Sequence, residues 1–164
     1  MIKEKCTSIT AEFGKQELKV VREFNAPREL VFQAWIDPQL FIQWVKPREL
    51  NIQFDSFDAR TGGFWKYMYT DKEQNEFSFH GVFHEVFFPE RIVQTFECEG
   101  QKGRVAFETN QFEDLADDKT KVTITFLFRS AEDRDALFSS GMERDIHESH
   151  ERLDELLAAE LSKS

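Results

Sequence analysis

The sequence predicts an α+β domain in which a curved antiparallel sheet wraps around a long C-terminal helix. Six segments between residues 50 and 128 alternate apolar and polar side chains and are separated by turn residues, as neighbouring antiparallel strands are. Residues 142–161 instead repeat apolar side chains at helical spacing. Strands that follow one another directly, with helices at either end of the run, indicate an antiparallel sheet rather than a doubly wound parallel one.

The N-terminal third predicts one strand followed by two short helices. Met1–Lys15 has no regular pattern and is expected to form a loose arm, whereas Glu17–Phe24 alternates as a strand does. Pro27 suits the first turn of a helix, and Asp37 followed by Pro38 is a second helix-start signal with Asp37 as the N-cap. Both helices precede the main run of strands.

Apolar stripes show which faces of the helices should be buried. Trp35 and Trp44 each lie on the stripe of one short helix, so both are expected to point inward and to close one end of the interior. Gly141 predicts a break before the long helix. That helix should rest on the concave face of the sheet through a stripe that includes Met142, Ile146, Ser149, Leu153 and Leu157.

Composition restricts the class of protein. The 164 residues fit a single domain spanning 1–164, and the net charge of −10 argues against nucleic acid or an anionic membrane as partner. The two cysteines, Cys6 and Cys98, have neither zinc-site nor disulfide-framework spacing. No apolar run has the length of a signal peptide or a membrane span. We therefore expect a cytoplasmic protein, and nothing in the sequence indicates its oligomeric state.

The aromatic content is the main functional observation, because the chain has 18 phenylalanines and three tryptophans. Many of them fall on strand and helix faces that should look toward one interior. Either they fill an aromatic core at ordinary density, or they line a cavity for a small molecule. The predicted cavity residues are Trp35, Trp44, Phe54, Trp65, Tyr67, Phe79, Phe83, Phe96, Phe107, Phe126, Met142, Ile146, Ser149 and His150.

Four ordered motifs resemble the family named for the activator of the heat-shock-protein-ninety ATPase. They are PRELVFQAWIDPQLFIQWVKP, the turn DARTGG, GVFHEVFFPERIVQTFE, and the C-terminal SAEDRDALFSSGME with ERLDELLAAEL. Together they span roughly residues 17–161. The resemblance implies the START-like, helix-grip fold of the SRPBCC superfamily, which is also that of the birch-pollen allergens. It also makes a cavity as plausible as a packed core.

The resemblance is incomplete at two places that bear on the ligand. Relatives often carry two tryptophans and a glycine where this chain has Trp44, Val45 and Lys46 before a proline. An aromatic residue often follows an acidic residue and glycine on the last helix, where this chain reads Arg144-Asp145-Ile146. Such changes should alter the shape of the cavity more than the fold.

Polar residues give few signs of catalysis or metal binding. His80 and His84 share a strand face but stand roughly 13 Å apart, and His147 with His150 has a spacing that surface helices often show. We therefore expect no metal site and no cofactor. Arg22 interrupts an apolar strand face and is either paired with a carboxylate or a cation at the cavity mouth.

Three functions remain in view. We expect a binding module for a small hydrophobic or aromatic molecule, with Gln94, Ser149, His150 and Arg22 as candidate polar groups at the wall or mouth. The family name suggests a chaperone-interacting protein as an alternative. A cyclase or hydrolase using the same cavity would need an acid or base there, for which His150, Arg22 and Tyr67 are the candidates, although no pair has a convincing spacing.

Overall fold

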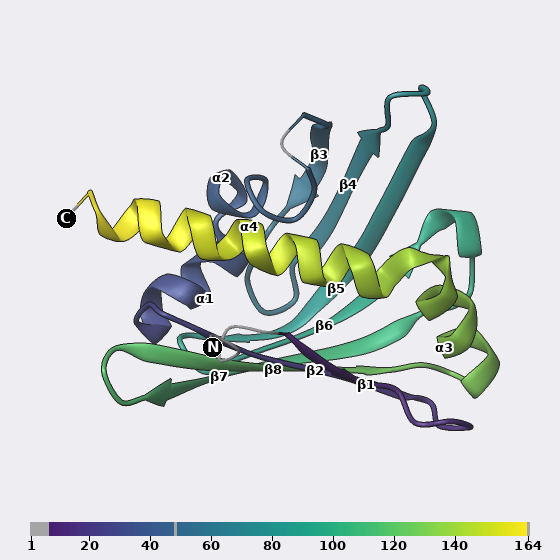
Figure 1. Cartoon of the computed structure of the whole chain (residues 1–164). Coiled ribbons are helices and arrows are strands. Elements are labelled where there is room, and N and C mark those ends of the chain that lie inside the picture. The colour runs from purple at the N-terminus through teal and green to yellow at the C-terminus, as the bar shows by residue number, and fades with distance from the viewer. Residues whose placement is uncertain (1–6, 48, 164) are drawn as a thin grey trace.

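The computed structural model describes residues 7–47 and 49–163 and shows the predicted α+β helix-grip architecture (Figure 1). Eight strands form one antiparallel sheet in the order β1-β2-β8-β7-β6-β5-β4-β3. The strands are β1 (Ser8–Thr10), β2 (Glu17–Phe24), β3 (Asn51–Phe57), β4 (Phe64–Thr70), β5 (Glu76–Phe87), β6 (Arg91–Cys98), β7 (Ala106–Leu115) and β8 (Lys119–Leu127). The helical segments are α1 (Arg28–Ile36), α2 (Pro38–Phe41), η1 (Glu99–Gln101), α3 (Ala131–Leu137), η2 (Phe138–Met142) and α4 (Glu143–Leu161).

The long helix α4 crosses the concave face of the sheet, as predicted, while α1 and α2 lie together at one end (Figure 1). Leu153, Leu156 and Leu157 of α4 are buried, and Met142 and Ile146 pack against the same core while half-buried. The predicted stripe therefore faces the sheet. It covers an apolar surface that the strands alone would leave exposed to water.

The two short helices begin and pack as the sequence predicts. The Asp37 carboxylate accepts a hydrogen bond from the Gln39 backbone N–H at 2.9 Å, which caps α2. Trp35 and Trp44 are both buried, with ring centroids 4.7 Å apart, and Trp44 Nε1 donates to the Ala34 carbonyl at 2.9 Å. The two indoles close one end of the interior.

The chain between β8 and α4 contains the predicted break. Ser130 caps α3 by accepting a hydrogen bond from the Asp133 backbone N–H at 3.0 Å. Gly141 then adopts a φ of +103° inside the wide turn η2, a conformation that side chains other than glycine rarely allow. This turn changes the direction of the chain, so that α4 starts on the concave face.

The prediction of a loose arm over residues 1–15 is wrong for part of that range. Ser8–Thr10 forms the edge strand β1, in which Ile9 pairs with Val20 of β2. Three residues are too few for alternation to reveal a strand, and the pairing depends on the neighbouring strand. Residues 1–6 of the predicted arm lie outside the described residues.

Candidate functional site

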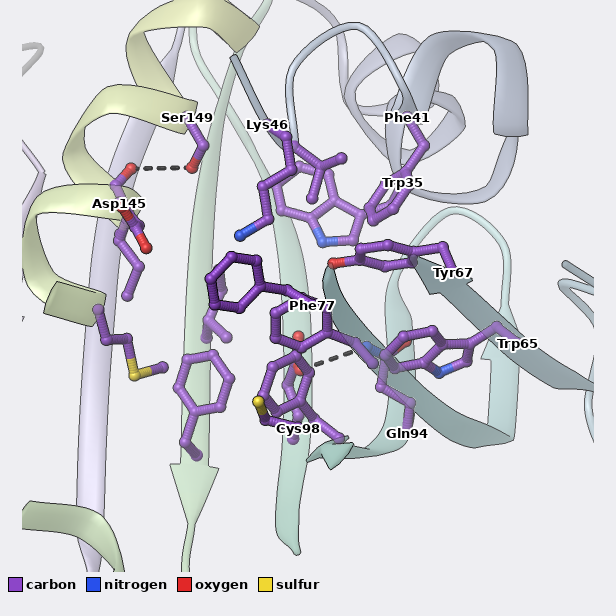
Figure 2. Close-up of a pocket in the computed structure, with 18 of the residues that line it drawn as sticks. Trp35, Phe41, Lys46, Trp65, Tyr67, Phe77, Gln94, Cys98, Asp145 and Ser149 are labelled. Carbon is purple, nitrogen blue, oxygen red and sulfur yellow. Dashed lines mark hydrogen bonds between the residues drawn. The ribbon is translucent and has the colours of Figure 1, made fainter. Parts of the chain in front are cut away.

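A cavity of about 350 Å³ lies between the concave sheet and the N-terminal half of α4 (Figure 2). Its walls are mostly aromatic and come from α1, α2, strands β3 to β8, and the segment from α3 to α4. The volume is within the range of small-molecule sites, roughly 300–1,000 Å³. The interior therefore contains an unfilled space of this size as well as a packed core.

Twelve of the fourteen predicted cavity residues line this space. They are Trp35, Trp44, Trp65, Tyr67, Phe79, Phe83, Phe96, Phe126, Met142, Ile146, Ser149 and His150. Gln94, predicted as a polar group of the wall, also lines it. Residues from elements far apart in the sequence are therefore brought to one cavity, as alternation on the strands and helical spacing on α4 predict.

Two predicted residues do not line the cavity. Phe107 is 47% exposed and lies on the outer face of β7, directly opposite Leu127 of β8. The prediction is wrong for Phe107 because Ala106, Glu108 and Asn110 occupy the inward positions of this strand. Phe54 is half-buried and packs behind the cavity wall, with its ring centroid 6.1 Å from that of Tyr67.

The inward register of β7 places Glu108 in the cavity wall, a residue that the aromatic pattern did not single out. Glu108 is 7% exposed, and its Oε1 accepts a hydrogen bond from Gln94 Nε2 at 3.2 Å. Burial raises the pKa of Glu108 from an ordinary 4.5 to about 7, while the Asn110 and Gln94 amides oppose that rise. At neutral pH this carboxyl exists in both protonated and ionised forms.

Lys46 supplies a cation to the other side of the cavity. Its side chain extends from the segment after α2, and Figure 2 shows its amine pointing into the cavity beside Phe77. Nζ lies 4.6 Å from the ring centroid of Tyr69 and 5.0 Å from that of Phe79, a cation–π arrangement. Burial lowers the pKa of Lys46, and the Asp145 carboxylate partly opposes this effect.

The Tyr67 hydroxyl also points into the cavity (Figure 2). Burial, followed by the neighbouring Glu108, raises the pKa of Tyr67 well above its ordinary value, so that the phenol stays protonated. Tyr67 therefore offers a hydroxyl group for hydrogen bonding rather than a base. Together with Glu108, Gln94 and Lys46, it places a few polar groups among the aromatic walls.

His150 and Arg22 belong to a chain of side-chain contacts that ties the N-terminal segment to α4. The Arg22 guanidinium donates to Thr7 Oγ1 at 3.0 Å and forms an ion pair with Asp154. Thr7 Oγ1 is 3.1 Å from His150 Nδ1. Arg22 is thus paired with a carboxylate and does not line the cavity, so the first of the two interpretations of this residue is confirmed.

Among the described residues, none of the three acid–base candidates is hydrogen-bonded directly to another. Burial, with the nearby Arg22 charge, lowers the pKa of His150 to about 3, so that the imidazole is neutral at physiological pH. Arg22 is held by Asp154, and Tyr67 stays protonated.

Within residues 7–47 and 49–163, no group of three or more His, Cys, Asp or Glu side chains is placed to hold a metal ion. None of the helices in these same ranges is long and apolar enough to cross a membrane.

Solved structures of bacterial proteins share this fold over nearly the whole chain. A protein from Rhodobacter sphaeroides is 23% identical with a TM-score of 0.80, covering 93% of this chain and 99% of its own. A protein from Arthrobacter aurescens, studied in solution, is 23% identical with a TM-score of 0.82, covering 93% of this chain and 91% of its own. At these identities the likeness establishes the fold.

A more distant match is described as an HSP90 activator from Plasmodium falciparum. It is 18% identical with a TM-score of 0.52, covering 68% of this chain and 72% of its own. No curated protein matches the sequence. Residues 25–158 match the family described as Activator of Hsp90 ATPase homolog 1-like protein, and this range contains the first three motifs and all but the last three residues of the fourth. The chain therefore belongs to this family, and its fold is the START-like helix grip that the motifs predict.

Proposed function

We propose that the protein binds a small, largely apolar molecule in the cavity between the sheet and α4. The observation that carries the proposal is the cavity itself, a space of about 350 Å³ with aromatic walls and a few inward polar groups. If these aromatic residues served only stability, packing them without a void would stabilise the folded state more, because side chains that line a void lose van der Waals contacts.

The direct test is native mass spectrometry of gently purified protein, followed by extraction and identification of any bound molecule. Binding by purified protein is then measured with the neutral fluorescent probe N-phenyl-1-naphthylamine, which brightens in apolar surroundings. We expect saturable binding in the presence of a chelator. The proposal fails if no molecule is extracted and the probe does not bind.

Two tryptophan substitutions on α4 locate the binding. Ser149 is buried in the cavity wall, so Ser149→Trp should fill the space and weaken probe binding by about tenfold or more. Glu148→Trp places the same side chain at an exposed position next to it and should leave binding unchanged. Circular dichroism confirms that each variant is folded. Equal binding by both variants would show that the probe sits elsewhere.

Gly81 is not a suitable position for filling the cavity, although its strand face looks inward. A Cβ atom there would come within 1.9 Å of the Thr95 carbonyl oxygen and 2.8 Å of the Trp65 ring. A phenylalanine at this position would therefore displace the backbone of β6, and weaker binding by such a variant could reflect a disrupted sheet. Ile146→Trp, at a half-buried position of the cavity wall, is the better second variant.

Chaperone binding is the second candidate function, and it rests on names and one surface feature. The family description refers to an Hsp90 ATPase activator, and the P. falciparum neighbour is called one. Phe107 and Leu127 form an exposed apolar pair on the outer face of the sheet. Measuring Hsp90 ATPase activity with wild type and with Phe107→Ser would test this candidate separately, because the substitution lies outside the cavity.

A further inference from the structure

Lys46 places a cation in the cavity that has no ion-pair partner among the described residues. Within the described residues, its amine forms no hydrogen bond and no ion pair, and it lies over the faces of Tyr69 and Phe79. An ammonium that has lost part of its water to aromatic walls is incompletely solvated. An anionic group placed beside it would restore the missing hydrogen bonds and balance its charge.

The other ionisable groups of the cavity do not neutralise Lys46. Asp145 faces it from α4 but is exposed to water at the rim and lies beyond ion-pair distance, so its charge is strongly screened. Glu108 is hydrogen-bonded to Gln94 in the wall and is partly protonated at neutral pH. His150 is neutral. Lys46 is therefore the cation that a bound molecule meets among the described lining residues.

We propose that the ligand of this cavity carries a carboxylate on an otherwise apolar or aromatic body, and that Lys46 selects for it. The proposal rests on the proposed binding function and adds the chemical class of the ligand. The carboxylate would lie at Lys46 and the Tyr67 hydroxyl, both of which point into the same space (Figure 2). The body would lie against deeper aromatic walls such as Trp65 and Phe96.

The opposite charge class is disfavoured by where Lys46 lies. An aromatic cavity with nearby carboxylates could in principle hold an ammonium compound through ring faces. Here the Lys46 amine already occupies the faces of Tyr69 and Phe79. A cationic ligand would need to displace it or to accept a like charge beside it.

Three naphthalene compounds of similar size separate these possibilities. Naphthalene-2-carboxylate, its neutral amide and 2-naphthylmethylammonium each compete with bound N-phenyl-1-naphthylamine, and their displacement constants are compared. We expect the carboxylate to bind about tenfold more tightly than the amide, as a hydrogen bond to a charged group allows. The preference should shrink as salt is raised.

The variants assign the preference to Lys46. Lys46→Met should remove the advantage of the carboxylate and leave the amide almost unchanged, since methionine keeps most of the apolar stem. Lys19→Met removes the same charge from an exposed position on β2 and should retain the advantage. Circular dichroism checks that both variants are folded.

The outcomes keep the two proposals apart. If the neutral probe does not bind wild-type protein, the binding function itself is refuted. If the probe binds but the carboxylate competes no better than the amide, or the ammonium competes best, the carboxylate proposal is wrong and the binding function stands. If Lys46→Met weakens carboxylate and amide equally, Lys46 contributes only to the cavity wall, and the proposal is again overturned.

Discussion

Ionisation of Glu108 should contribute to the pH dependence of this protein's stability, and Glu108→Gln should remove that contribution. Glu108 is buried in the cavity wall on β7, and its carboxyl group accepts a hydrogen bond from the Gln94 amide. A glutamine at this position keeps the shape of the side chain and can accept the same hydrogen bond. The substitution therefore removes the titration while leaving the wall in place.

The sign and size of the effect follow from the shift in pKa. The pKa of Glu108 is about 7 in the folded protein, against an ordinary 4.5, so the folded state holds more protons between these pH values. The contribution of Glu108 to the free energy of unfolding should then fall as pH rises through this window, by up to about 1.4 kcal/mol per pH unit. Summed over the window, ionised Glu108 costs about 3 kcal/mol above pH 7.

Urea denaturation at several values between pH 5 and pH 8.5 measures this cost. Glu108→Gln should be more stable than wild type by only about 1 kcal/mol at pH 5 and by about 3 kcal/mol at pH 8.5. Glu113→Gln is the matched control, because Glu113 is exposed on the same strand. A difference between Glu108→Gln and wild type that stays constant across the pH range would refute the reasoning. It would show that water or structural relaxation solvates the carboxylate.

Two further substitutions test the packing and the buried ion pair. Trp44→Ala should lower the free energy of unfolding by about 3–5 kcal/mol, because the indole is buried and its N–H is hydrogen-bonded. A loss below about 1 kcal/mol in urea denaturation would contradict the place of Trp44 in the core. Asp154→Asn leaves the buried Arg22 guanidinium without its carboxylate and should cost about 3 kcal/mol by the same measurement, whereas the exposed Asp117→Asn should cost little.

The fold could be predicted because local patterns and long-range packing agree along most of the chain. Alternating strands, the Asp37 cap and the break at Gly141 are all local signals, and each is present in the structure. The short edge strand β1 gave no such signal. The Thr7–His150 contact, between residues 143 positions apart, could not be inferred from either segment alone.

The cavity could be predicted only in part, for reasons that differ between residues. In β7 each face carries one phenylalanine, Phe107 on the outer face and Phe112 on the inner one, so hydrophobicity alone does not select the register. The hairpin offers a correction, because Phe112 lies opposite Val122, and counting back from that buried pair places Glu108 inside. Lys46 lies in a segment without periodicity, so its direction depended on the three-dimensional arrangement.

The apolar face of helix α4 is divided between the packed core and the cavity. Its C-terminal half buries Leu153, Leu156 and Leu157 in the packed core, where removing a large side chain creates a new void. Its N-terminal half presents Ile146 and the small Ser149 to a void that already exists. Substitutions that enlarge the N-terminal half should therefore impair binding before stability, whereas truncations in the C-terminal half should impair stability first. Both halves belong to one rigid helix, so the buried leucines of the C-terminal half fix the position of the cavity wall in the N-terminal half. Residues of that wall can therefore vary without changing the fold.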